Sequence, residues 1–240
     1  MNYMLAPLGD HYDDGFGAMG LSFSLAARTL IEARKDNRNI FLEHLPSNFL
    51  LRHAIELYLK SGIIILHRRL NIPFGDQPHT AQPAVRVGGA WKAIQKVHSV
   101  GDLYAHWKDL IQTNRKLLES ICKFESAKWD VPRELDEAIA IIDETDSRST
   151  YYRYPDLRDE KADLEKSNFK EVPVSELFSS GQGQQQPAVL FAIKNDEGDF
   201  TRAFALDDNT EQRATSALLA ADKEMDEFHA MMRLELTDTW

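Results

Sequence analysis

Three ionisable residues recur at four-residue spacing within the most apolar stretch of the chain. Arg52, Glu56 and Lys60 lie in residues 45–60, where most other positions are leucine, isoleucine or alanine. On a helix that advances about 100° per residue, the three side chains share one face with their neighbour His53. A guanidinium can stabilise negative charge on a phosphate, and an imidazole can transfer a proton near neutral pH. We expect function at this polar stripe.

The same stripe also has a purely structural interpretation. Because opposite charges four residues apart on a helix attract, Arg52, Glu56 and Lys60 can form an ion-pair ladder worth roughly a few tenths of a kcal/mol per pair. Alternatively, the stripe lines a cleft between helices or a dimer seam, where a desolvated guanidinium and imidazole hold phosphate or transfer protons. The sequence leaves both interpretations open.

Two further segments carry candidate residues. Arg38 and His44 are close enough in sequence to act together on a ribose hydroxyl and its phosphate, although such a spacing also arises by chance. Residues 146–155 contain three tyrosines and two arginines, including Tyr152 and Arg153. These side chains can stack on bases and contact phosphates, or they can anchor a loop on the bundle.

No zinc spacing or phosphate-binding glycine loop is present, so we expect neither a metal nor a cofactor.

Composition restricts the class of protein. The 240 residues are 43% hydrophobic, enough for a substantial core, and carry a formal net charge of -10. This acidity argues against a protein that coats nucleic acid through bulk charge, although it permits a local basic patch. A single cysteine, no signal-like N-terminus and no long apolar run favour a cytoplasmic protein without membrane contact.

The elements that position these residues are mainly helices. Apolar periodicity predicts helices near residues 15–35, 46–70, 103–121 and 131–142, and Ser99 with Asp102 gives the third a capping pattern. The first two are long and closely connected, which favours antiparallel packing. Residues 71–89 are rich in proline and glycine and read as a loop. An antiparallel helical bundle is therefore the expected fold.

The pattern changes after residue 155. We expect a helical bundle over residues 1–155, a flexible linker over 156–187, and a third part over 188–240 that packs on the bundle. In this last part, residues 188–194 and 200–206 flank a turn and predict a β-hairpin, and a final helix follows from about residue 210 to 236. The predicted fold class is mainly α, with a small hairpin and a C-terminal helix.

Three blocks of the chain resemble HEPN-domain proteins, the helical bundles of prokaryotic toxin-antitoxin and antiviral systems. Residues 49–60 are similar to the family's second long helix with its Arg-His-Ala-x-Glu-Leu-x-x-Lys stripe. Residues 98–103 are similar to the His-[Asn/Asp/Ser]-Leu-x-x-Leu opening of the next helix. Residues 146–155 resemble the Asp-x-x-Ser-x-x-Phe-Arg-Tyr-Pro segment of one branch. Together the blocks span residues 45–155.

The resemblance implies a bundle that is usually a homodimer, whose active members are metal-independent ribonucleases using an Arg and a His a few residues apart. Active members carry this pair late in the bundle, whereas Arg38 and His44 lie before the second helix. Either other residues such as Arg52, His53 and Arg153 build a catalytic site, or the chain is a non-catalytic member.

We therefore expect a HEPN-like homodimer that engages RNA or a nucleotide in a prokaryotic defence or toxin-antitoxin setting. Its activity as a metal-independent endoribonuclease stays open, and a non-catalytic protein-interaction scaffold is the alternative. A cognate antitoxin or another defence-system protein is the expected partner. The candidate catalytic residues are Arg38, His44, Arg52 and His53, and the candidate RNA- or nucleotide-binding residues are Glu56, Lys60, His98, Tyr152 and Arg153.

Overall fold

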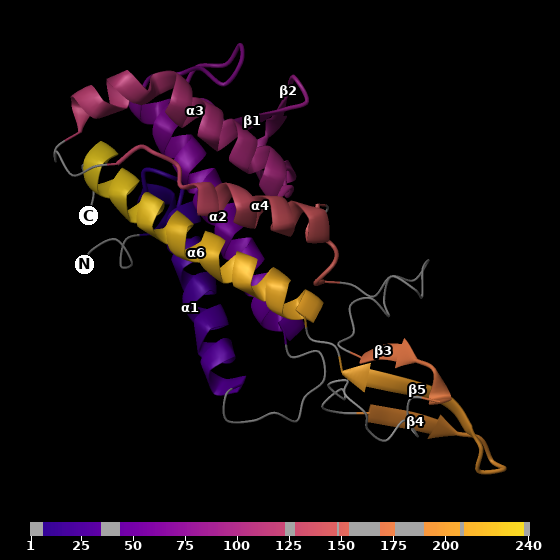
Figure 1. Cartoon of the computed structure of the whole chain (residues 1–240). Coiled ribbons are helices and arrows are strands. Elements are labelled where there is room, and N and C mark those ends of the chain that lie inside the picture. The colour runs from indigo at the N-terminus through magenta and orange to yellow at the C-terminus, as the bar shows by residue number, and fades with distance from the viewer. Residues whose placement is uncertain are drawn as a thin grey trace.

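The fold is mainly helical, with two small antiparallel sheets (Figure 1). The computed structural model describes residues 7–34, 44–122, 128–147, 149–153, 169–175, 190–206 and 209–237. Within these residues the α-helices are α1 (Phe16–Arg34), α2 (His44–Arg69), α3 (Val100–Ile121), α4 (Arg133–Asp146) and α6 (Asn209–Leu236). The strands are β1 (Ala84–Val87), β2 (Ala90–Ala93), β3 (Phe169–Val172), β4 (Leu190–Lys194) and β5 (Phe200–Leu206). Two short 3-10 helices cover Leu8–Asp10 and Ile94–Lys96.

Helix α2 forms the centre of the bundle. It packs against α1, α3 and α6, and α4 packs on α3 and α6. Helices α1 and α2 run in opposite directions, as the sequence predicted (Figure 1). Because leucine and isoleucine surround most of α2, side chains such as Leu51, Ile55 and Ile63 are fully buried. The polar stripe therefore lies on the most buried of the described helices.

Local caps set the starts of two helices around α2. Ser99 Oγ accepts a hydrogen bond from the Asp102 N–H at 3.1 Å, which confirms the predicted cap of α3. Asp13 plays the same part before α1, where its carboxylate accepts from the N–H groups of Gly15 and Gly17 at 3.1 and 2.8 Å. It also accepts from Ser61 Oγ on α2 at 2.5 Å, so the cap joins the two helices.

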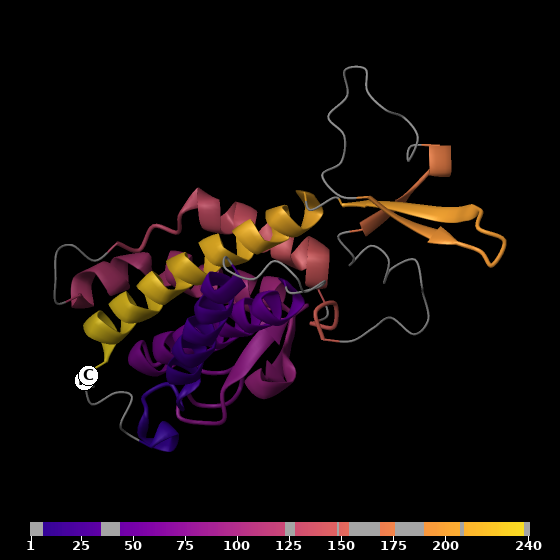
Figure 2. The ribbon, with the colours of Figure 1, turned by 90° about the horizontal axis from the view of Figure 1, so that it is seen from below.

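The predicted C-terminal hairpin is confirmed and is part of a larger sheet. Strands β4 and β5 pair antiparallel, and β3 pairs with the other side of β5. Strand β3 lies in residues 156–187, where the sequence predicted a linker, because four residues are too few for a clear alternating pattern. Figure 2 shows the sheet beyond the end of the bundle where α6 begins, while α6 itself packs on α2 and α4.

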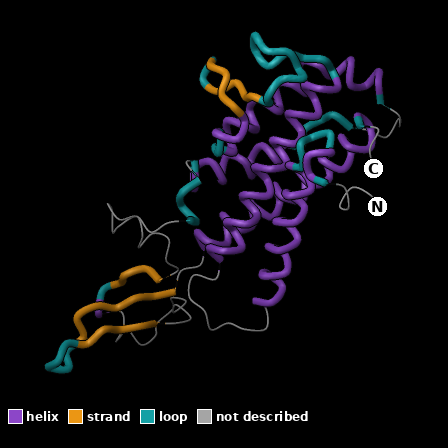
Figure 3. The backbone as a smooth tube through the Cα atoms, turned by 180° about the vertical axis from the view of Figure 1, so that it is seen from behind, coloured by secondary structure: helices purple, strands orange, loops and turns teal. Residues whose placement is uncertain are grey.

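A second hairpin begins within residues 71–89, which the sequence predicted as a loop, and ends at Ala93. Strands β1 and β2 pair antiparallel through the turn at Gly88 and Gly89, whose φ angles are +57° and +85°. Two positive φ angles define a type I′ turn, which glycine adopts without strain. Figure 3 shows the two sheets at separate places along the bundle. No helix in the described part of the chain is long and apolar enough to cross a membrane.

Candidate functional site

The polar stripe of α2 is a buried network of charges. Arg52 Nη1 lies 3.1 Å from Glu56 Oε2, and Lys60 Nζ lies 2.7 Å from Glu56 Oε1. All three side chains are at most 3% exposed. Burial raises the pKa of Glu56, but the charge and hydrogen bond of Lys60, the hydrogen bond of His98 and the charge of Arg52 outweigh burial and hold that pKa below its usual range. Glu56 is therefore ionised between two cations.

Arg52 also connects α2 to two other parts of the bundle. Its Nη2 donates to the backbone carbonyl of His98 at 2.5 Å, just before α3. Its Nε lies 2.9 Å from Asp146 Oδ2, at ion-pair distance but without the alignment of a hydrogen bond. Asp146 Oδ1 in turn accepts from the N–H groups of Thr150 and Tyr151. Every nitrogen of the guanidinium thus faces a protein oxygen, which favours the ion-pair interpretation of the stripe.

His98 brings this network to the surface. Its side chain is 48% exposed, and Nδ1 lies 3.0 Å from Glu56 Oε1. Because Glu56 is ionised and can only accept, His98 donates this hydrogen bond from Nδ1. The imidazole is thus held in one orientation by a buried carboxylate.

A second group lies at the N-terminal end of the same helix face. The Arg153 guanidinium sits 5.1 Å from the centre of the Phe49 ring, and the His53 ring stacks on Phe49 at 5.9 Å. Phe23 of α1 meets His53 edge-on at 4.6 Å. Burial lowers the pKa of His53, and Arg153, Lys60 and Arg52 lower it further against Glu56. His53 is therefore a neutral imidazole in surroundings rich in positive charge.

This second group retains unused hydrogen-bonding capacity. Among the described residues, His53 Nδ1 and Arg153 Nε are buried without a hydrogen-bond partner. Arg153 also has no carboxylate partner in the described part of the chain, in contrast to the fully engaged Arg52. An unpaired guanidinium over an aromatic ring is a suitable contact for a phosphate next to a stacked base.

The C-terminal end of the helix face holds a pair of histidines. His67 Nε2 lies 3.1 Å from His106 Nε2 of α3, and His67 Nδ1 lies 3.0 Å from the carbonyl of Ile72. A carbonyl only accepts, so His67 carries its proton on Nδ1 and His106 donates from Nε2. Phe74 stacks on His67 at 4.2 Å, and Trp91 meets both imidazoles edge-on. The sequence did not indicate this pair as a site, because 39 residues separate the two histidines.

The remaining candidates lie apart from these groups or outside the described residues. His44 is buried at the first position of α2, two turns before Arg52. Tyr152 is buried, and burial raises the pKa of its hydroxyl. Arg38 lies outside the described residues. The structure therefore brings together Arg52, Glu56, Lys60 and His98 and places His53 with Arg153, whereas the predicted pairing of Arg38 with His44 lies outside the described residues.

In comparisons with known proteins, no family model, curated protein or solved structure matches the chain. Within the described residues, no group of three or more histidine, cysteine, aspartate or glutamate side chains could hold a metal ion. Function must therefore be inferred from the geometry of the stripe and its two ends.

Proposed function

We propose that the protein is a HEPN-like helical bundle that binds single-stranded RNA or a nucleotide in a prokaryotic defence or toxin-antitoxin setting. Phe49, His53 and Arg153 form the proposed contact. The observation that carries this proposal is the Arg153 guanidinium, which lies over Phe49 without a carboxylate partner among the described residues. A phosphate would pair with Arg153, while a base would stack at the Phe49 edge.

Binding without cleavage is the function that this geometry favours. Arg52 was a candidate for stabilising a transition state, but its three nitrogens face Glu56, Asp146 and the His98 carbonyl. Releasing it for a phosphate would leave Asp146 buried without its cation and Glu56 with Lys60 alone, at a cost of several kcal/mol. We therefore assign Arg52, Glu56 and Lys60 to the architecture of the site.

The test is fluorescence anisotropy with a labelled single-stranded RNA of mixed sequence. We expect Arg153→Ala and Phe49→Ala each to weaken binding by roughly 5- to 100-fold, the range for losing a stacked base or a charged contact. Arg133→Ala is the matched control, because this arginine of α4 is 87% exposed and already pairs with Glu137. Equal affinities for the wild type and Arg153→Ala would contradict the proposed contact.

The same preparations answer the question of catalysis. Gel analysis of the RNA after incubation in a metal chelator should show no cleavage by the wild type, His53→Ala or His44→Ala proteins. Cleavage that survives a chelator and disappears in His53→Ala would replace the binding role with a ribonuclease role. Cleavage present equally in all three proteins would indicate a contaminating nuclease, which a further purification step would remove.

A second candidate function, a protein-interaction scaffold, is favoured by the three-stranded sheet. Phe191 and Ile193 of β4 are 45% and 50% exposed and lie on one face, since they are two residues apart on a strand. The proposed partner is a second copy of the chain. Sedimentation equilibrium should show a dimer that Phe191→Ser with Ile193→Ser weakens, while Ala192→Ser on the opposite face does not. A monomeric wild type would contradict this candidate.

A further inference from the structure

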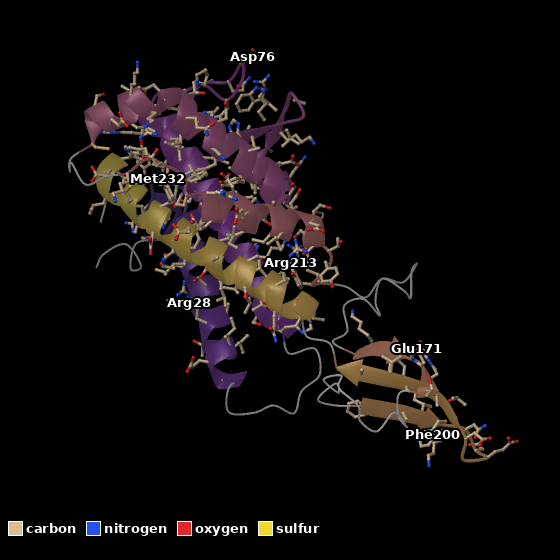
Figure 4. The ribbon with its side chains drawn as sticks, viewed as in Figure 1. Arg28, Asp76, Glu171, Phe200, Arg213 and Met232 are labelled. Carbon is tan, nitrogen blue, oxygen red and sulfur yellow. The ribbon has the colours of Figure 1, made fainter. Side chains whose placement is uncertain are left out.

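The segment that ends α2 and forms the first hairpin is basic, although the chain as a whole is acidic. Residues 67–98 contain five arginines and lysines and one aspartate, a formal net charge of +4, whereas the whole chain carries -10. The aspartate, Asp76, is exposed in the loop before β1 (Figure 4). A local excess of positive charge in an acidic protein indicates a surface for an anionic partner.

Arg68 of this segment pairs with Asp14, but the three cations on and beside the hairpin are available to such a partner. Arg86 on β1, Lys92 on β2 and Lys96 just after it are exposed, and none pairs with a carboxylate among the described residues. Arg86 lies directly opposite Trp91 in the hairpin, so the two side chains share one face. Trp91 is 38% exposed. The hairpin therefore presents an aromatic ring beside an unpaired guanidinium.

The bundle holds this hairpin in place. Trp91 contacts His67 and His106 edge-on, with ring centres 5.9 and 5.5 Å away, and Val85 of β1 is fully buried. Gly75 fits beside the indole because a Cβ at that position would lie 2.7 Å from Trp91 Cδ1. One side of the indole is thus fixed by packing, while part of the ring remains exposed to solvent.

The hairpin packs on α3 and reaches, through Trp91, the face of α2 that carries the proposed RNA contact. On an α-helix Phe49, Glu56 and His67 lie within about 20° of one another. Arg153 lies over Phe49, His98 over Glu56, and Trp91 over His67. The 18 residues from Phe49 to His67 span about 27 Å of helix, the length of several nucleotides.

We infer that the β1–β2 hairpin is a second contact for the same RNA strand, with Trp91 as a stacking platform and Arg86, Lys92 and Lys96 as phosphate contacts. This inference rests on the proposed RNA-binding function. A single strand fits better than an acidic peptide, because a peptide would pair with the cations but has no base to stack on Trp91. An RNA that reaches both ends of the face would pass the exposed ring of His98.

The experiment compares a short and a long single-stranded RNA, of about 4 and 12 nucleotides, by fluorescence anisotropy at several salt concentrations. Arg86→Ala, Lys92→Ala and Lys96→Ala are combined in one variant, and Trp91→Leu is tested separately. The control combines Lys116→Ala and Lys128→Ala, two exposed lysines distant in sequence from the hairpin. Circular dichroism of each variant confirms that its helices are intact.

We expect the triple variant to bind the long RNA at least tenfold more weakly. The slope of log affinity against log salt concentration should become shallower by about 2, since each phosphate contact on a single strand contributes about 0.7. Trp91→Leu should weaken binding by roughly 5- to 100-fold, and the control variant should match the wild type.

If the triple variant and Trp91→Leu bind like the wild type while Arg153→Ala binds weakly, the hairpin contact is overturned and the proposed function stands. If the hairpin variants bind weakly and Arg153→Ala does not, the hairpin contact stands and the Arg153 contact falls. A wild type that binds neither RNA overturns both.

Discussion

The polar stripe of α2 and the β1–β2 hairpin hold their cations in opposite ways. In the stripe, Arg52 and Lys60 are buried and neutralised by Glu56 and Asp146. On and beside the hairpin, Arg86, Lys92 and Lys96 are exposed without carboxylate partners in the described part of the chain. A buried cation must be paired because removing it from water is costly, whereas an exposed one remains hydrated and needs no partner.

The difference separates the residues that hold the fold together from those that we propose contact a ligand. The neutral cluster fixes the start of α3 through the His98 carbonyl and the turn after α4 through Asp146, so it positions both His98 and Arg153. It has no free charge to offer a ligand. The exposed cations contribute little to folding and are free to contact phosphate. Substitutions in the polar stripe should therefore change the free energy of unfolding, and substitutions in the hairpin should change the affinity for RNA.

The largest expected effect is on stability, from removing the carboxylate that the buried cations share. Glu56→Ala leaves Arg52 and Lys60 without that partner, so we expect the free energy of unfolding to fall by about 3–5 kcal/mol in urea titrations. Glu119→Ala is the matched control, because Glu119 also follows its arginine, Arg115, by four residues but is 50% exposed. We expect it to cost at most about 0.5 kcal/mol. Similar losses in both variants would show that burial does not distinguish the two ion pairs.

The next effect is an acid destabilisation at the histidine pair. Burial, with the nearby His67 and Arg86, lowers the pKa of His106 to about 4 against the pull of Asp109. Because the unfolded chain has a histidine pKa near 6.5, it binds more protons than the folded chain between pH 6.5 and 4. The stabilising contribution of neutral His106 is therefore complete above pH 6.5 and is lost as the pH falls towards 4.

Urea titrations at pH 7.5 and pH 5 measure this loss. For His106 alone we expect about 2 kcal/mol between the two pH values, from a pKa shift worth about 1.4 kcal/mol per unit. Other histidines add to the loss in the wild type, so the informative quantity is its difference from His106→Gln, which no longer titrates at this position. An equal pH dependence in both proteins would contradict the burial of a neutral His106.

The sequence predicted the helices of this fold because their signal is local. The periodicity of α1, α2, α3, α4 and α6 placed each helix within a few residues of its observed bounds. The Arg52–Glu56–Lys60 ladder followed from the same spacing, since side chains four apart on a helix are neighbours. Strands β1 and β2 were missed because four residues carry almost no period and their turn is marked by two glycines within a longer loop.

The resemblance grouped His98 and Arg153 with the helix of Arg52, but the individual long-range contacts of the site were beyond the sequence pattern. Asp146 and the His98 carbonyl complete the shell of Arg52 from 94 and 46 residues away, and only the packing of α3 and α4 on the bundle brings them there. The contrast between paired and unpaired arginines was equally hidden. Arg52 and Arg153 are the same residue type, so the sequence does not distinguish them. In the structure Arg52 is buried and paired with carboxylates, whereas Arg153 has no carboxylate partner among the described residues.

The smallest expected effect on stability is in the hairpin. It compares an exposed lysine of the hairpin segment with the buried lysine of the stripe. Lys96 and Lys60 are the same residue type, but Lys96 is exposed and unpaired among the described residues whereas Lys60 is 3% exposed beside Glu56. Lys96→Ala should change the free energy of unfolding by no more than about 0.5 kcal/mol, because an exposed lysine loses neither packing nor an ion pair. Lys60→Ala should cost several kcal/mol, because it leaves part of the Glu56 charge buried without compensation. Thermal and urea unfolding of both variants measure this difference, and a large loss in Lys96→Ala would place the hairpin cations in the architecture of the fold instead of on a surface for recognition.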